Sequence, residues 1–341
     1  MSQARGPSAG PAAAAPSDAE LREALAPLLR EAGAGAPGEI RRRPYEYRTS
    51  FPLERLELAL GDGAVLHLLF KQLDWDALGE EARLAKPRFL HDPLREPAVY
   101  GSVLGSAPAG PPRHYGSAID PARGRHWLFI EWVDGRELFQ VGDRRLWEAV
   151  AAWLGTMHRQ LGEDLDRHRS DGRLLEHDRA YYRRWIERAR RFAHAPGQPA
   201  PRARSIDSLA ARWEPAIEEL VAMPKTVIHG ELYASNVLVA GDAAAPRVCP
   251  VDWELAAAAP GLLDLAALAS GGWSDDDREA LASAYGAAAG AGSFTARQLD
   301  LARLQLAVQW LGWAKPGWSP PAEHQQDWLG EALALAERLG L

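Results

Sequence analysis

The sequence predicts an α+β fold of two lobes, with a sheet-rich N-terminal lobe and a larger, mostly helical C-terminal lobe. Short apolar runs typical of strands dominate residues 40–132, whereas helical periodicity dominates residues 143–339. The segment Val133-Asp134-Gly135 marks the change between the two patterns. We therefore expect a disordered tail over residues 1–18, an N-terminal lobe over 19–133 and a C-terminal lobe over 134–341.

The N-terminal lobe is expected to begin with a helix over residues 19–32, because leucines recur there at helical spacing. Strands are predicted over 41–47, 53–60 and 64–71, and Gly61-Asp62-Gly63 indicates a hairpin between the last two. Residues 83–104 are typical of a helix interrupted near Pro93 and Pro97. A further antiparallel pair is predicted over residues 113–118 and 126–132.

The C-terminal lobe is expected to contain six helices, over residues 143–161, 176–193, 205–223, 275–289, 295–313 and 323–339. Short apolar runs at 226–229, 237–240 and 247–251 predict small strands that hold loops. Two lobes joined by a short connector create a cleft, and ligands usually bind at such junctions.

Composition excludes several classes of function. The chain has 341 residues and a formal net charge of −7, so it lacks the basic field that non-specific nucleic-acid binding needs. Cys249 is the single cysteine, which excludes an intrachain disulfide and a zinc site built on several thiolates. Neither a signal peptide nor a membrane span is predicted, and we expect a cytoplasmic protein.

The most informative segment is VIHGELYASNVLV, residues 227–239, which is followed by VCPVDWE, residues 248–254. It places Glu231, Asn236 and Asp252 at the ends of short predicted strands. Phosphoryl transfer needs a carboxylate that orients an incoming hydroxyl, and it needs oxygen ligands for the magnesium ion on the phosphates. The three side chains therefore predict a phosphoryl-transfer site.

HGELYASN resembles the catalytic loop of the aminoglycoside phosphotransferase and choline kinase-like family, and PVDWE resembles the metal-binding segment of that family. The resemblance covers about residues 40–339. It implies a protein-kinase-like fold and an enzyme that transfers the γ-phosphoryl group of ATP, or of another nucleoside triphosphate, to a hydroxyl of a small molecule. Mg²⁺ is the implied metal.

The resemblance also implies a role for each motif residue. Glu231 stands at the position of the catalytic aspartate, while Asn236 and Asp252 match the metal ligands. Asp264 resembles the aspartate that braces the catalytic loop, and His229 is expected to hold that loop without ionising in the reaction.

Nucleotide-binding residues are implied in the N-terminal lobe. Lys71 corresponds to the lysine that contacts the phosphates, with Glu96 as its ion-pair partner, although a surface lysine is the alternative reading of Lys71. Residues 129–133, including Glu131 and Val133, resemble the hinge that binds adenine. The turn that contains Thr49, Ser50 and Phe51 is expected to cover the phosphates.

Glu231 is the main departure from the family pattern, because a glutamate carboxylate lies one methylene further from the backbone than an aspartate carboxylate. A misplacement of about 1 Å can lower a rate on the order of a hundredfold. A pseudokinase that binds nucleotide with little or no turnover is therefore one alternative. A kinase that phosphorylates peptide Ser or Thr is another.

The acceptor is not determined by the sequence. Acidic residues at 274–279 and 323–337 would permit a cationic aminoglycoside, whereas the arginine-rich segment 181–191 is either a solvated helix face or a site for an anionic acceptor. Tyr233 and Ser235 are candidates for acceptor contacts, and Glu254 either faces the substrate or caps a helix. The tryptophans of the C-terminal region are expected to serve packing more than an acceptor pocket: Trp310, Trp313, Trp318 and Trp328.

Overall fold

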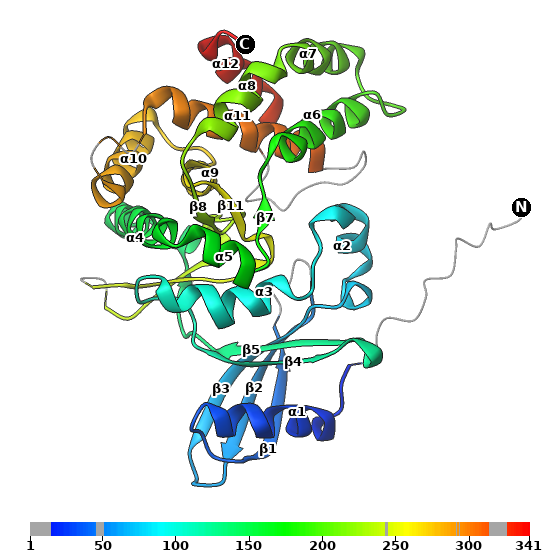
Figure 1. The fold of residues 1–341 in the computed structure, drawn as a ribbon, viewed down its shortest axis with the longest axis vertical. Coiled ribbons are helices and arrows are strands. Elements are labelled where there is room, and N and C mark those ends of the chain that lie inside the picture. Colours follow the sequence, from blue (N-terminus) through cyan, green and yellow to red (C-terminus); the bar gives the residue numbers. More distant parts are fainter. Residues whose placement is uncertain (1–14, 46–50, 243–244, 291, 293, 314–325) are drawn as a thin grey trace, which may run out of the picture. The chain divides into compact units, whose positions relative to one another are not determined.

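The computed structural model describes residues 15–45, 51–242, 245–290, 292, 294–313 and 326–341 (Figure 1). It confirms the predicted α+β architecture, with an antiparallel sheet near the N-terminus and a helical remainder. The chain divides into two compact units, Met1–Leu84 with Arg113–Trp132 and Ala85–Pro112 with Val133–Leu341. Each unit is described separately.

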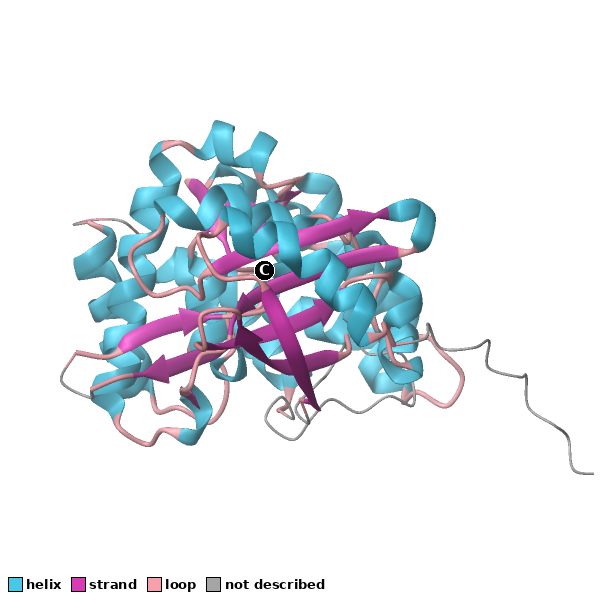
Figure 2. Ribbon diagram, turned by 90° about the horizontal axis from the view of Figure 1, so that it is seen from below, coloured by secondary structure: helices cyan, strands magenta, loops and turns pink. Residues whose placement is uncertain are grey.

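The first unit is built on a five-stranded antiparallel sheet of order β1-β2-β3-β5-β4. Its strands, magenta in Figure 2, are β1 (Pro37–Pro44), β2 (Leu53–Leu60), β3 (Val65–Gln72), β4 (His114–Asp120) and β5 (Arg125–Glu131). The predicted hairpin is confirmed: the Gly63 N–H donates to the Leu60 carbonyl at 2.9 Å, and Gly63 has a φ of +86°. The first strand ends at Pro44, earlier than predicted.

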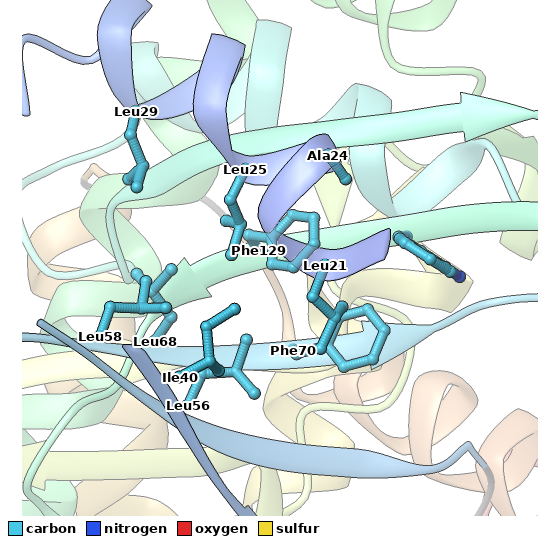
Figure 3. Close-up of a cluster of buried hydrophobic side chains, with 11 residues drawn as sticks. Leu21, Ala24, Leu25, Leu29, Ile40, Leu56, Leu58, Leu68, Phe70 and Phe129 are labelled. Carbon is cyan, nitrogen blue, oxygen red and sulfur yellow. The ribbon is translucent and has the colours of Figure 1, made fainter. Parts of the chain in front are cut away.

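Helix α1 (Asp18–Glu31) covers one face of this sheet through an apolar stripe. Leu21, Leu25 and Leu29 are fully buried, and Figure 3 shows them directed toward side chains of the sheet such as Phe70 and Phe129. Ser17 caps the helix and forms a capping box with Glu20. Residues 17 and 18 therefore belong to the folded unit and not to the predicted tail, whose residues 1–14 lie outside the described part.

Residues 85–112 belong to the second unit, although the sequence placed them in the N-terminal lobe. The segment contains two 3₁₀ turns, η2 (Arg88–Leu90) and η4 (Leu104–Ser106), with α3 (Arg95–Ala98) and a π-helical turn, η3 (Val99–Val103), between them. Two side chains attach this segment to the rest of the second unit: Lys86 pairs with the carboxylate of Glu254, and Arg95 donates to the backbone carbonyl of Glu254. The 3₁₀ helix η1 (Trp75–Ala77) and helix α2 (Glu80–Ala85) precede it.

Beyond residue 133, the second unit contains the six predicted helices, one of them broken in two, and two short helices that were not predicted. They are α4 (Arg144–Glu163), α5 (Leu165–Asp171), α6 (Arg179–Ala193), α7 (Ala200–Ala211), α8 (Trp213–Ala222), α9 (Leu262–Leu268), α10 (Asp275–Ala289), α11 (Ala296–Trp313) and α12 (Trp328–Leu339). The single helix predicted over 205–223 is wrong, since α7 and α8 meet at Arg212. Pro215 explains the break, because it lacks an N–H and its ring would clash with the carbonyl four residues earlier.

Two small sheets hold the loops of the second unit. One has the order β10-β9-β6 and the other β7-β11-β8. Three strands were predicted, β8 (Lys225–Ile228), β9 (Val237–Ala240) and β10 (Arg247–Pro250), while β6 (Arg136–Glu137), β7 (Leu175–Glu176) and β11 (Ala257–Pro260) were missed. Among the described residues, no helix has the length and apolar character of a membrane-spanning segment.

Candidate active site

The predicted catalytic loop begins directly after β8, where the chain turns sharply at Gly230. This residue has a φ of +89°, which L-residues with side chains rarely adopt. A Cβ atom at this position would also overlap with the carbonyl oxygen of Leu255. Glycine is therefore required immediately before Glu231.

Asp264 on α9 braces this loop. Its Oδ2 accepts from the backbone N–H of His229 at 2.6 Å, and its Oδ1 accepts from the backbone N–H of Gly230 at 2.9 Å. The side chain is fully buried, so these two hydrogen bonds satisfy a carboxylate that would otherwise be costly to bury. The bracing role implied by the family resemblance is present in the structure.

His158 on α4 extends this network and was missed by the sequence analysis. Its Nε2 lies 3.2 Å from Oδ2 of Asp264, and its Nδ1 lies 3.0 Å from the Tyr285 hydroxyl on α10. The Thr226 hydroxyl donates to the His158 carbonyl at 2.6 Å. A histidine on an amphipathic helix gives no sequence signal for such distant partners.

His229 serves the loop through hydrogen bonds, as expected. Its Nδ1 accepts from the Glu231 backbone N–H at 3.3 Å, so Nε2 carries the ring proton and donates to the Val251 carbonyl at 2.8 Å. Both ring nitrogens are therefore occupied by structural hydrogen bonds. His229 does not act as the general base in this geometry.

Asn236 closes the loop that starts at Glu231. Its side-chain Nδ2 donates to the Glu231 carbonyl at 2.9 Å, and that carbonyl also accepts from the Tyr233 backbone N–H at 2.7 Å. These bonds fix the backbone of Glu231, whose side chain is half-buried. The amide geometry leaves Oδ1 of Asn236 as the atom that can ligate a cation.

Asp252 lies at the same end of the β9–β10 ladder as Asn236. Val237 is paired with Pro250, and the Val251 N–H donates to the Asn236 carbonyl at 2.9 Å. Asp252 itself has a left-handed conformation, with φ 69° and ψ 58°. Fully buried Trp253 fixes this turn, since its Nε1 donates to the Pro250 carbonyl at 3.1 Å.

An amide oxygen and a carboxylate at one ladder end fit a hard divalent cation that keeps several waters, such as Mg²⁺. The described residues contain no group of three or more His, Cys, Asp or Glu side chains arranged for a metal.

Glu254 forms a buried ion pair with Lys86, and neither side chain is more than one-tenth exposed. Arg95 donates to the Glu254 carbonyl at 2.6 Å and to the Leu90 carbonyl at 2.8 Å. The carboxylate of Glu254 is therefore paired with Lys86 and does not cap a helix. The pairing was missed because Lys86 is separated from Glu254 by 168 positions in the sequence.

Glu96, the predicted partner of Lys71, lies in the same region as Asp252, because the charges of both carboxylates act on Tyr100. The hydroxyl of Tyr100 is buried, which raises its pKa well above the usual value, and the charges of Glu96 and Asp252 raise it further. Both carboxylates therefore lie within electrostatic range of one phenol. Glu96 is itself 2% exposed.

Aromatic side chains lie beside Glu231. Burial, followed by the charge of Glu231, raises the pKa of Tyr233 well above its usual value, and burial likewise raises the pKa of Tyr181. Both phenols thus remain protonated and cannot serve as bases. The Tyr233 ring lies 5.7 Å from Trp310, which stacks on Trp328 at 5.4 Å.

The predicted nucleotide residues of the first unit occupy its sheet. Lys71 on β3 is 6% exposed, which contradicts the surface-lysine alternative, and its Nζ lies 5.4 Å from the centre of the Phe51 ring. The carboxylate of Glu131 accepts from the Arg113 backbone N–H at 3.0 Å. Thr49 and Ser50 lie outside the described residues. The nucleotide roles of Lys71, Glu131 and Val133, and the pairing of Lys71 with Glu96, stay predictions.

Solved structures of similar fold come from small-molecule kinases. A microcompartment-associated aminopropanol kinase superposes with a TM-score of 0.58 at 14% identity, covering 88% of this chain and 90% of the other. The GDP complex of aminoglycoside 2'-phosphotransferase-IIIa gives 0.56 at 15% identity, with 91% and 95% covered. A choline/ethanolamine kinase family protein from Mesorhizobium loti gives 0.52 at 16% identity, with 94% and 93% covered. At these identities the likeness establishes the fold.

A comparison of the sequence with curated proteins finds no match. The family model described as the phosphotransferase enzyme family matches residues 94–304, which is more than half of the chain and includes the catalytic loop, Asp252 and Asp264. The predicted enzyme class is thereby confirmed, and the chain belongs to the phosphotransferase enzyme family.

Proposed function

We propose that this phosphotransferase moves the γ-phosphoryl group of ATP, or of another nucleoside triphosphate, to a hydroxyl of a small molecule. The observation that carries the proposal is the loop in which Asp264, His229 and Asn236 fix the backbone of Glu231, with Asn236 at the same end of the β9–β10 ladder as Asp252. A pre-positioned carboxylate beside cation ligands is what phosphoryl transfer requires, since its catalysis is mostly positioning and charge stabilisation.

In this proposal the carboxylate of Glu231 accepts a hydrogen bond from the acceptor hydroxyl and takes its proton as the hydroxyl oxygen bonds to the γ-phosphorus. The bond between that phosphorus and the bridging oxygen breaks, and the nucleoside diphosphate leaves with the electron pair. Oδ1 of Asn236 and the carboxylate of Asp252 hold Mg²⁺, which supplies neutralisation of phosphate charge when bound. Lys71 is the proposed ligand of the phosphates, and Glu131 and Val133 are the proposed adenine contacts. Tyr233 and Ser235 of the loop are the proposed acceptor contacts.

The positions of two helices of the second unit favour a small-molecule acceptor over a peptide acceptor. Tyr181 of α6 lies within electrostatic range of Glu231, and Trp310 of α11 contacts Tyr233 of the catalytic loop. Side chains from α6 and α11 thus take up space beside the proposed base, where a peptide substrate needs an open groove.

The test is ADP release from Mg-ATP in the presence of hydroxylated acceptors, with wild type, Glu231→Gln and Glu231→Asp compared. We expect Glu231→Gln to lose about a hundredfold or more of the acceptor-dependent rate, because it removes the base but keeps the side-chain length. We expect Glu231→Asp to retain more activity than Glu231→Gln. Nucleotide binding with no acceptor-dependent turnover in any of the three proteins would favour the pseudokinase alternative.

A further inference from the structure

Helix α6 carries arginines with two kinds of environment. Three of them form ion pairs with carboxylates of α7 and α8: Arg179 with Glu218, Arg183 with Glu214 and Arg190 with Asp207. Arg184 and Arg188 form no ion pair with any carboxylate in the described part of the chain. The helix therefore has one face whose charges are compensated and another whose cations lack an anion.

The uncompensated cations lie on an aromatic surface. The guanidinium carbon of Arg184 is 4.4 Å from the centre of the Phe89 ring, and that of Arg188 is 5.6 Å from the Trp185 ring. Trp185 in turn stacks on Trp313 at 5.7 Å. Arginine on aromatic rings is held flat with its N–H groups directed outward from the ring edge, a geometry suited to a planar oxyanion.

Arg188 is incompletely satisfied. Its Nε donates to the Gly312 carbonyl at 3.0 Å, whereas its Nη2 is buried with no hydrogen-bond partner among the described residues. Burial, and then the charges of Arg191 and Arg184, lower the pKa of Arg188 to about 10, so the side chain still carries its charge at neutral pH. A buried charged donor without a partner is costly, and an anion would relieve that cost.

These arginines share a helix face with the active site. Tyr181, Trp185 and Arg188 follow one another at spacings of four and three residues, and the rings of Tyr181 and Trp185 lie 6.1 Å apart. The charge of Glu231 acts on Tyr181 at one end of this row. At a rise of about 1.5 Å per residue, Arg188 lies about 10 Å along the helix from Tyr181.

The acids that would attract a cationic acceptor are engaged elsewhere. Glu331 pairs with Arg303 at 3.1 Å, Asp277 pairs with Arg144 at 2.9 Å, and Asp275 lies 3.7 Å from Arg278. Several described acids of residues 274–279 and 323–337 are therefore already paired with arginines. These are the two stretches that could have formed an acidic pocket. Two arginines without a carboxylate partner in the described part of the chain favour an anion over a polycation near α6.

We propose that the acceptor carries an oxyanion group, a carboxylate or a phosphate, that is bound by Arg184 and Arg188, about 10 Å along α6 from Tyr181 at the Glu231 end of the helix. This inference rests on the proposed function, because it assigns the far end of the acceptor in the same site. It makes the substrate class a hydroxylated anion with an apolar or aromatic middle part that packs on Phe89, which is partly exposed, while buried Trp185 supports the arginines from within the fold.

The test uses four probes of one length, 8-hydroxyoctanoate, 8-hydroxyoctyl phosphate, 1,8-octanediol and 8-amino-1-octanol. Binding to the full chain is measured by calorimetry with ADP and Mg²⁺ present, and no turnover is needed. We expect one or both anions to bind at least about tenfold more tightly than the amine, as a charge-assisted hydrogen bond predicts. The tighter of the two anions distinguishes a carboxylate from a phosphate.

Arg188→Gln and Arg184→Gln should each weaken the anion probes, by about tenfold or more for Arg188→Gln, while leaving the diol unchanged. Arg183→Gln is the matched control, because Arg183 lies on the same helix but pairs with Glu214. Thermal unfolding verifies that each variant is folded, and exposed Arg184 provides the test if Arg188→Gln does not fold.

Tighter binding of the amine than of both anions, or an equal loss in Arg183→Gln, would overturn the inference. So would competition between the anion probes and ADP, because the arginines would then bind nucleotide. The two proposals fail separately: arginine-dependent anion binding without ADP release from any acceptor removes the proposed function alone. Acceptor-dependent ADP release that changes neither with the charge of the acceptor nor with substitution of either arginine would overturn this inference alone.

Discussion

Gly230 and Asp252 both have a positive φ, and each of them turns the backbone shortly after a strand, where the candidate site residues lie. Gly230 directs the chain from β8 into Glu231, and Asp252 follows the end of β10 on the side of the ladder where Asn236 lies. A non-glycine residue in this conformation costs on the order of 1–2 kcal/mol. Asp252 carries that cost at the position where a metal ligand is proposed.

Replacement of Gly230 by alanine should destabilise the protein more than the same change at an open position. Gly230→Ala combines an unfavourable φ with overlap against the Leu255 carbonyl, so we expect a loss of about 2–4 kcal/mol in the free energy of unfolding. Gly197→Ala is the control, because Gly197 has a φ of +85° and nothing lies within 4 Å of its Cβ direction. Equal losses in urea unfolding would contradict the steric account.

His177, next to β7, should make the stability of the protein depend on pH. Burial lowers its pKa from 6.5 to about 3. At pH values between these two, the unfolded chain therefore binds a proton at this residue and the folded chain does not. Stability should therefore fall as pH is lowered from 7 to 5, by about 2 kcal/mol from this residue alone. In His177→Gln, urea unfolding at the two pH values should show a smaller difference; an unchanged difference would rule out His177 as the source.

At the scale of elements, residues 85–112 are attached to the second unit by the Lys86–Glu254 ion pair and by Arg95. Removing one partner of a buried pair leaves an uncompensated charge, whereas replacing both by apolar side chains is often tolerated. We expect Lys86→Met to cost about 3–5 kcal/mol and the double variant Lys86→Met/Glu254→Leu to cost less than either single change. Additive losses in the double-mutant cycle would show that the two side chains are not coupled.

The helix pair α7–α8 shows how one residue overrides a regular pattern. Apolar residues over 205–223 keep helical spacing, and they predicted one continuous helix. Pro215 divides the segment, and α8 starts anew at Trp213. The short strands β6, β7 and β11 were not predictable from periodicity, because two-residue and alanine-rich strands carry too little pattern.

At the scale of the whole molecule, the sequence predicted the α+β class, most helices and the loop that holds Glu231 and Asn236. These features depend on local signals, namely periodicity, glycine positions and a contiguous motif. His158 and Lys86 could not be predicted, since each acts through a partner more than one hundred residues away. The same limit applies to Arg184 and Arg188, whose sequence segment was compatible with a solvated face and with an anion site.

We propose that Asp252 and the loop from His229 to Asn236 form the phosphoryl-transfer site of the enzyme. The most direct measurement is ADP release from Mg-ATP with a panel of hydroxylated anions, amino alcohols and sugars, for wild type, Asp252→Ala and the surface control Asp171→Ala. We expect acceptor-dependent release in wild type and Asp171→Ala, and a loss of about a hundredfold or more in Asp252→Ala. Acceptor-dependent release that persists at the wild-type rate in folded Asp252→Ala would contradict it.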